Sequence, residues 1–274
     1  MKKTKSSLPV VRPLQDRLPS CLLYLFCGLV FFYLIMPIFI VIPMSFSSAM
    51  FLKFPPPGFS LQWYKNYLTS RDWIDATWVS LRVASATTLI ATVLGTLLSF
   101  ALLRGRFRGK SLIYSVAVSP MIIPLIIVAI AVYFFYSKIH LVGTLTGIIA
   151  AHTILATPFV LVIVTSTLKG FDETLERASL SLGANPLKTF LFVTLPMIKA
   201  GIISGAFFAF ITSFDELVVA IFIAGTHAVT LPKRMWDGIQ QEIDPTISAV
   251  SSIFIGLSVL LMIGIELLRR RTKA

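Results

Sequence analysis

Charged side chains are scarce in this chain of 274 residues, since Asp, Glu, Lys and Arg together make up only 13% of it. A soluble protein carries about a quarter. Hydrophobic residues make up 56%, and the mean hydropathy is +0.87. A water-soluble globule of this size cannot bury so much apolar surface. The composition therefore excludes a soluble enzyme and a disordered chain, and it predicts an integral membrane protein.

Cysteine is nearly absent as well. Cys21 and Cys27 lie in one apolar run, where six residues of helix point them in different directions, so neither a disulfide scaffold nor a metal site is predicted. The histidines His140, His152 and His227 are isolated, with no HExxH or Cys/His spacing. We expect no metal and no cofactor.

The net charge of +12 does not indicate a nucleic-acid partner. Lys and Arg fall in short clusters between long apolar runs, as membrane topology requires. Residues 106–111 resemble the end of a phosphate-binding loop, but Arg104 stands where the first glycine belongs and no buried strand precedes it. The sequence predicts no nucleotide site and no enzyme activity of its own, so any ATP is hydrolysed by partner subunits.

Six apolar runs are long enough to cross a bilayer, which takes about 20 residues. An all-α, polytopic membrane protein with six transmembrane helices is therefore predicted. The runs are Leu22–Phe46, Thr77–Leu103, Ile113–Tyr136, Gly143–Leu168, Ile198–Ala224 and Ile247–Leu268. The fifth run contains Gly201 and Gly205, a GxxxG spacing that lets two membrane helices approach closely.

Lys and Arg concentrate in residues 2–17, 104–110, 169–199 and 269–273. The positive-inside rule then places both termini in the cytoplasm, with the chain crossing the membrane several times and contacting its lipid. The predicted organisation follows the chain in order: a cytoplasmic N-terminal segment at 1–20, a first transmembrane helix at 21–48, a periplasmic segment at 49–76, a transmembrane domain of five helices at 77–268 and a cytoplasmic tail at 269–274.

The periplasmic segment carries Trp63, Tyr64, Tyr67 and Trp73. Aromatic side chains often anchor at headgroup depth. One interpretation is a short helix lying on the membrane, and the other is a docking surface for an external partner.

A cytoplasmic helix–turn–helix is predicted between the fourth and fifth runs. Asp172 is a good N-cap, and a small, mostly apolar stripe follows at helical spacing. Gly183 stands where a residue with positive φ ends a helix. The stripe consists of Leu175, Ala178, Ser179 and Leu182. After Gly183 and Ala184, Asn185 and Pro186 start a second helix, and Leu195 and Pro196 end it. Such a knob either folds back on its own bundle or lies in a groove of a partner.

The spacing of this segment resembles the EAA loop of ABC-importer permeases: Glu-Ala-Ala, three residues, Gly, nine residues, Ile-x-Leu-Pro. Gly183 is followed after nine residues by Val193-Thr194-Leu195-Pro196. Ala178 matches the first Ala, and Ser179 replaces the second. Arg177 stands where the family's Glu belongs, and Glu176 is one place early.

The resemblance covers most of the chain from about residue 63. It implies a permease subunit in which this loop docks on an ATPase. The partners it implies are a second permease subunit, two cytoplasmic ATPase subunits and a periplasmic substrate-binding protein.

Two adjacent acids, Asp215 and Glu216, fall inside the fifth run. An acid in the hydrocarbon region costs at least about 2.5 kcal/mol on insertion scales, so the pair needs a reason. At least one is expected to line the substrate path or a helix interface, and the other to pair with a residue such as Arg82. Which of the two faces the path stays open.

The stretch Ser213–Val219 is similar to permeases of the spermidine/putrescine importer group. A buried carboxylate could replace the lost hydration of a polyamine, which agrees with that likeness. An importer of iron or another small solute is the first alternative. A secondary transporter whose acids relay protons is a more distant one, since no inverted repeat relates the halves and the cytoplasmic loop would have no role.

Overall fold

The computed structural model of the chain describes residues 14–226, 228–241 and 244–273. Parts of the predicted N-terminal segment and tail, and His227, lie outside these residues. Regular structure in the described part is helical, apart from an isolated bridge between Ser47 and Phe59. The chain divides into two compact units, Met1–Tyr67 with Ile243–Ala274, and Leu68–Glu242. The predicted domain boundaries stay a prediction.

The first unit is built on α1 (Leu14–Ser45) and α12 (Thr246–Lys273), which pack together. A tyrosine on α2 (Gln62–Thr69) joins them, because the Tyr64 hydroxyl lies 2.7 Å from Ser45 Oγ on α1 and 2.8 Å from Ser252 Oγ on α12.

Three of the four aromatic rings expected at headgroup depth are buried inside the protein, namely Trp63, Tyr67 and Trp73. Buried rings cannot contact lipid headgroups. The interpretation of these three side chains as surface anchors is therefore wrong.

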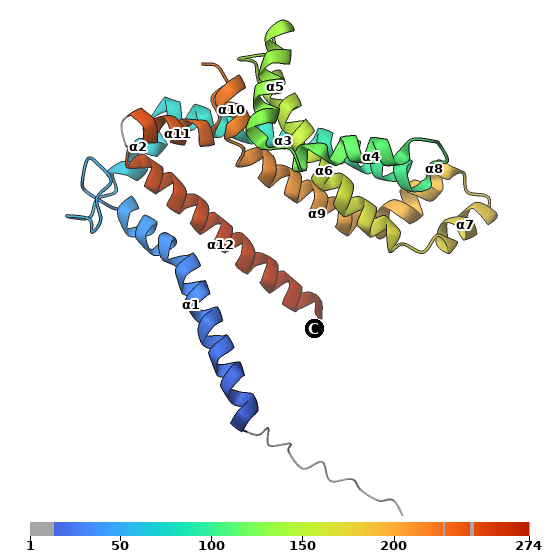
Figure 1. Ribbon diagram of the computed structural model, residues 1–274, viewed down its shortest axis with the longest axis horizontal. Helices are drawn as coiled ribbons and strands as arrows, with labels where there is room; N and C mark the ends of the chain where they lie inside the picture. Colours follow the sequence, from blue (N-terminus) through green and yellow to red (C-terminus); the bar gives the residue numbers. More distant parts are fainter. Residues whose placement is uncertain (1–13, 227, 242–243, 274) are drawn as a thin grey trace, which may run out of the picture. The chain divides into compact units, whose positions relative to one another are not determined.

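The second unit is organised around three long helices that run side by side, α3 (Arg71–Arg104), α6 (Leu145–Lys169) and α9 (Leu195–Phe214) (Figure 1). Val160 and Val164 of α6 pack in one cluster with Ala91 of α3 and Ile198 of α9. Around this bundle lie shorter elements: α4 (Lys110–Val118), η1 (Ser119–Met121), α5 (Leu125–Lys138), α7 (Thr174–Ser181), α8 (Pro186–Thr189), η2 (Phe190–Thr194), α10 (Val218–Ile223) and α11 (Leu231–Gln241).

Glycines let the three helices approach closely. A Cβ at Gly95 of α3 would lie 2.6 Å from Val160 Cβ, and one at Gly205 of α9 would lie 3.2 Å from Val160 Cα. One turn earlier on α9, a Cβ at Gly201 would lie 2.7 Å from Thr167 Cβ. The GxxxG packing predicted for the fifth run is confirmed, with α6 as the partner helix.

Four helices among the described residues are long and apolar enough to cross a membrane: Leu22–Ser45, Arg71–Arg104, Leu145–Lys169 and Pro186–Phe214. They match four of the six predicted runs. The last run, Ile247–Leu268, falls within α12, whose described apolar part is shorter, Thr246–Leu260. The total of six spans stays a prediction.

The third predicted run is not a single straight helix. It divides into Lys110–Met121 and Leu125–Lys138, which meet at 103°. Pro120 and Pro124 flank the break. Each proline removes a backbone N–H and crowds the preceding turn, so two of them four residues apart break the helix instead of bending it.

Replacing Gly201 with Ala is expected to lower the midpoint of thermal unfolding in mild detergent. The new methyl group would overlap Thr167, and overpacking of this kind costs about 1–3 kcal/mol. Gly28 of α1 is the matched control, because a Cβ there meets nothing within 4 Å. Gly28→Ala should leave the midpoint unchanged or raise it. An unchanged midpoint in Gly201→Ala would contradict the assigned packing.

Candidate functional site

The helix–turn–helix between α6 and α9 forms as predicted, but α7 starts at Thr174, so its N-cap is Glu173 and the predicted N-cap, Asp172, lies one residue before it. Asp172 Oδ1 accepts the Thr174 backbone N–H at 2.9 Å. This hydrogen bond lowers the pKa of Asp172 below its ordinary value, and Arg177 adds a smaller Coulombic contribution in the same direction. The carboxylate therefore stays ionised at the start of α7, where the helix dipole favours a negative charge.

The turn between the two helices is also as predicted. Gly183 has φ of +89°, in the left-handed region that side chains rarely adopt. Asn185 caps α8, since its Oδ1 accepts the Lys188 backbone N–H at 2.8 Å, and Pro186 occupies the first helical position.

The second helix does not end at Leu195–Pro196, contrary to the prediction. Pro186–Phe214 is one helical segment of 29 residues. The five residues before Leu195 form a π-helical turn, η2. A wider turn can accommodate the loss of the backbone hydrogen bond that Pro196, which has no N–H, cannot donate. The second helix of the helix–turn–helix is thus continuous with α9.

The apolar side chains of this loop are uncovered. Leu182 is 90% exposed and Leu187 65% exposed, while Leu175 and Leu180 are also exposed. A loop that folds back to bury this stripe on its own bundle, the first of the two options predicted from the sequence, is not what the structure shows.

Polar contacts hold the back of the loop instead. Thr194 Oγ1, buried in the π-helical turn, donates to Glu176 Oε1 at 2.7 Å. Ser179 Oγ lies 3.0 Å from Thr189 Oγ1. Arg177, at the position of the family's Glu, is exposed and lies 3.6 Å from the Glu173 carboxylate.

Arg104 joins this group from the end of α3. Its guanidinium pairs with Glu173 and lies 3.4 Å from Glu176 Oε2. The sequence analysis used Arg104 only to reject a phosphate-binding loop. A basic residue in the last turn of one span, together with the acids of the loop after the fourth predicted run on the same predicted side of the membrane, was the signal that could have indicated this role.

The fifth predicted run is wrong as a continuous helix, because α9 ends at Phe214 and α10 starts at Val218. Asp215 is the C-cap of α9, and Glu216 lies in the break. The expectation that both acids sit inside one continuous transmembrane helix is corrected accordingly.

Glu216 supplies the hydrogen bonds that the break removes. Its Oε1 accepts the Val219 N–H at 3.0 Å, and its Oε2 accepts the Ala220 N–H at 3.2 Å. These are N–H groups of the first turn of α10, which have no partner within the helix. The residue is only 6% exposed. Glu216 is therefore a buried cap.

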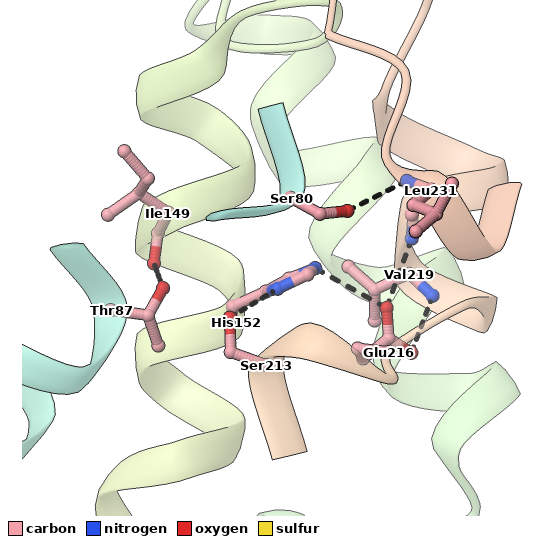
Figure 2. A network of polar contacts seen from close by, with 9 residues as sticks. Ser80, Thr87, Ile149, His152, Ser213, Glu216, Val219 and Leu231 are labelled. Atoms are coloured by element: carbon pink, nitrogen blue, oxygen red, sulfur yellow. Dashed lines mark hydrogen bonds and ion pairs between the residues drawn. The ribbon is translucent and has the colours of Figure 1, made fainter. Parts of the chain in front are cut away.

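Figure 2 shows that His152 of α6 completes this network. Its Nδ1 lies 2.9 Å from Ser213 Oγ on α9, and its Nε2 lies 3.4 Å from Glu216 Oε2. His152 is 1% exposed. The partner of the buried acid is thus this histidine and not Arg82, which the sequence analysis had suggested.

Two further contacts in Figure 2 fix the neighbouring helices. Ser80 Oγ of α3 accepts the Leu231 N–H of α11 at 2.7 Å, and Thr87 Oγ1 donates to the Ile149 carbonyl of α6 at 3.4 Å. These contacts tie α3 to α11 and to α6, the helix that carries His152.

Asp215 differs from its neighbour in every respect that matters for binding. It is exposed, whereas Glu216 is buried. Its backbone N–H continues the α9 ladder to Ile211 O at 3.0 Å, so the side chain is not needed as a cap. The structure brings the two acids together at one helix break but gives them different surroundings.

A helical bundle with membrane-length spans, a helix broken beside a buried acid and an exposed helix–turn–helix defines a polytopic membrane transport protein. Residues 91–274 match the family of binding-protein-dependent transport system inner membrane components, and the chain belongs to this family.

Named relatives support this membership. The putrescine transport system permease protein PotI of Escherichia coli K12 is 32% identical over 92% of this chain and 89% of its own. The spermidine/putrescine transport system permease protein PotC of Haemophilus influenzae is 29% identical over 90% of this chain and 95% of its own.

Solved structures share the fold. A bacterial ABC transporter involved in the import of the acidic polysaccharide alginate has a chain with a TM-score of 0.75 and 14% identity, covering 93% of this chain and 97% of that one. The methionine ABC transporter MetNI, in an inward-facing conformation, has a TM-score of 0.54 and 22% identity, covering 70% and 91%.

Replacing Glu216 with Gln is expected to lower the thermal unfolding midpoint in detergent. A glutamine has one acceptor oxygen where two backbone N–H groups need one each, and a buried unsatisfied donor costs about 1–3 kcal/mol. Asp215→Asn is the matched control and should stay close to the parent, because its side chain is exposed. Equal midpoints in the two variants would contradict the capping role of Glu216.

Proposed function

We propose that this chain is a permease subunit of an ATP-driven importer that carries a polyamine, putrescine or spermidine, across the bacterial inner membrane. Family membership and the names of the relatives support the class and the substrate. The observation that carries the mechanism is the exposed helix–turn–helix at the base of α9, with its leucines uncovered.

The coupling loop of the proposed transporter is this helix–turn–helix, Leu175–Leu195. Exposed leucines such as Leu182 and Leu187 are costly to leave in water, and an apolar helix face laid in a partner's groove is a common mode of recognition. The proposed groove belongs to a cytoplasmic ATPase. ATP-driven closure of two such ATPase subunits would displace the loop and, through the continuous helix, α9.

Asp215 is the proposed contact for the solute. A polyamine carries several positive charges and loses hydration when it enters the bundle, and an exposed carboxylate at the end of a broken helix can compensate for part of that loss. Glu216 is unsuited to the role, because its two oxygens accept the N–H groups of α10. In this proposal Asp215 contacts the solute, and Glu216 stabilises the break between α9 and α10.

A second permease subunit beside the chain and a periplasmic substrate-binding protein outside it complete the proposed assembly. Both termini are placed in the cytoplasm, as the distribution of Lys and Arg favours. Transport by alternating access follows: the binding protein releases the solute to an outward-open bundle, and ATP hydrolysis returns the bundle to the inward-open state.

Uptake of labelled putrescine and spermidine tests the substrate and the path together. The complete complex in vesicles should show saturable, ATP-dependent uptake. Asp215→Asn should raise the KM at least about tenfold, because a hydrogen bond to a charged group contributes about 1.5–3 kcal/mol. Transport of an unrelated solute only, by an assembled complex, would overturn the polyamine assignment and favour another importer. Uptake without any ATPase subunit would favour a secondary transporter.

Two substitutions at one position test the coupling loop. Gly183→Val should uncouple ATP hydrolysis from uptake, because a β-branched residue at φ of +89° costs about 1–2 kcal/mol and displaces the turn. Gly183→Asn is the matched control, since Asn tolerates this conformation, and it should stay coupled. The measurement is solute imported per ATP hydrolysed. A fully coupled Gly183→Val complex would remove the loop from the mechanism.

A further inference from the structure

The coupling loop has covalent connections to only two of the three core helices. It leaves α6 after Lys169 and enters α9 through the π-helical turn. The third helix, α3, ends at Arg104 and continues into a different loop. If the loop moves, nothing in the covalent chain requires α3 to move with it.

Arg104 adds a direct electrostatic contact between α3 and the start of the loop, beside the ring contact of Phe100 with Phe190. Its guanidinium pairs with Glu173 at the start of α7 and lies 3.4 Å from Glu176 Oε2, one turn further on. The other oxygen of Glu176 accepts the hydroxyl hydrogen of Thr194, at the base of α9. One carboxylate thus contacts the end of α3 and the base of α9 at the same time.

These groups are more than a surface ion pair. The side chains of Arg104 and Glu176 are 22% and 21% exposed, whereas Arg177, which also faces Glu173, is 77% exposed. Exposed pairs of this kind contribute little, since water and salt screen them, while partly buried charges are screened less. The contact from α3 is therefore the stronger restraint on the loop.

The backbone after Arg104 fixes where its side chain emerges. Gly105 turns the chain sharply out of α3: a Cβ at this position would overlap the Ala101 carbonyl oxygen and lie 2.8 Å from the Phe107 ring. The position of Arg104 at the end of the helix is set by this close approach.

We propose that Arg104 is a positioning residue for coupling: through Glu173 and Glu176 it makes α3 follow the movement of the loop, so that all three core helices respond to the ATPase. This inference rests on the proposed function of the loop. It gives α3 a direct link to α7, in addition to the packing of α3 against α6 and α9.

The test compares Arg104→Gln, Arg104→Lys and Glu176→Gln in the complete complex in vesicles, scored as putrescine imported per ATP hydrolysed. Arg104→Gln and Glu176→Gln should each lower this ratio at least about fivefold and lower the maximal uptake rate, with the KM for putrescine unchanged. Combining them should cause no further loss beyond that of Arg104→Gln alone, because Arg104→Gln already removes the Arg104–Glu176 contact. Lysine keeps the positive charge but lacks the planar guanidinium that contacts both carboxylates. Arg104→Lys should therefore import more putrescine per ATP than Arg104→Gln, but less than the parent.

Arg108→Gln is the matched control. It removes one positive charge from the segment that follows α3, four residues after Arg104, and Arg108 is exposed. The ratio should stay within twofold of the parent.

The outcomes separate this inference from the proposed function. If Gly183→Val uncouples the complex while assembled Arg104→Gln and Glu176→Gln complexes stay coupled, the role of Arg104 is overturned and the loop keeps its function. If neither Gly183→Val nor Arg104→Gln uncouples, both fall. If the Arg104 and Glu176 variants all fail to assemble, the contact serves stability and the positioning role is overturned. A drop in the ratio with partial recovery by Lys supports the inference.

Discussion

A bilayer offers no water to hydrogen-bond a backbone, and this constraint decides what can happen where a membrane helix is interrupted. At the end of α9 the chain breaks, and the first N–H groups of α10 would be left without partners. Glu216 accepts them, and His152 lies against the carboxylate from the neighbouring helix. The break and the buried acid are therefore one feature, since each would be costly without the other.

The same constraint explains why the two acids have different surroundings. One carboxylate is committed to the backbone, which leaves Asp215 with its side chain uncommitted at the same place. A charged side chain within a membrane bundle is costly, and the cost is larger where backbone groups beside it also lack partners. Polar contacts of Ser80, Ser213 and His152 connect the helices of this bundle.

Much of the fold was predictable because lipid imposes a simple rule of length and polarity, so most of the long runs coincide with helices. The turn at Gly183 and the cap at Asn185 were predictable from local backbone chemistry. The break after Phe214 was not, since the run is apolar on both sides and Glu216 acts on residues that follow it. The role of Arg104 was hidden for another reason: its partners lie about 70 residues away, a separation that no local pattern reveals.

The uninterrupted helical segment Pro186–Phe214 has a mechanical consequence. At about 1.5 Å per residue, its 29 residues reach about 43 Å, from the exposed turn to the acid at the far end. A rod of that length magnifies rotation: a tilt of about 5° at its base carries the tip through about 4 Å, comparable to the width of a methylene chain. In the proposed transporter, a displacement small enough to fit within a protein–protein groove would thus suffice to widen or close the solute path at the other end of this helix.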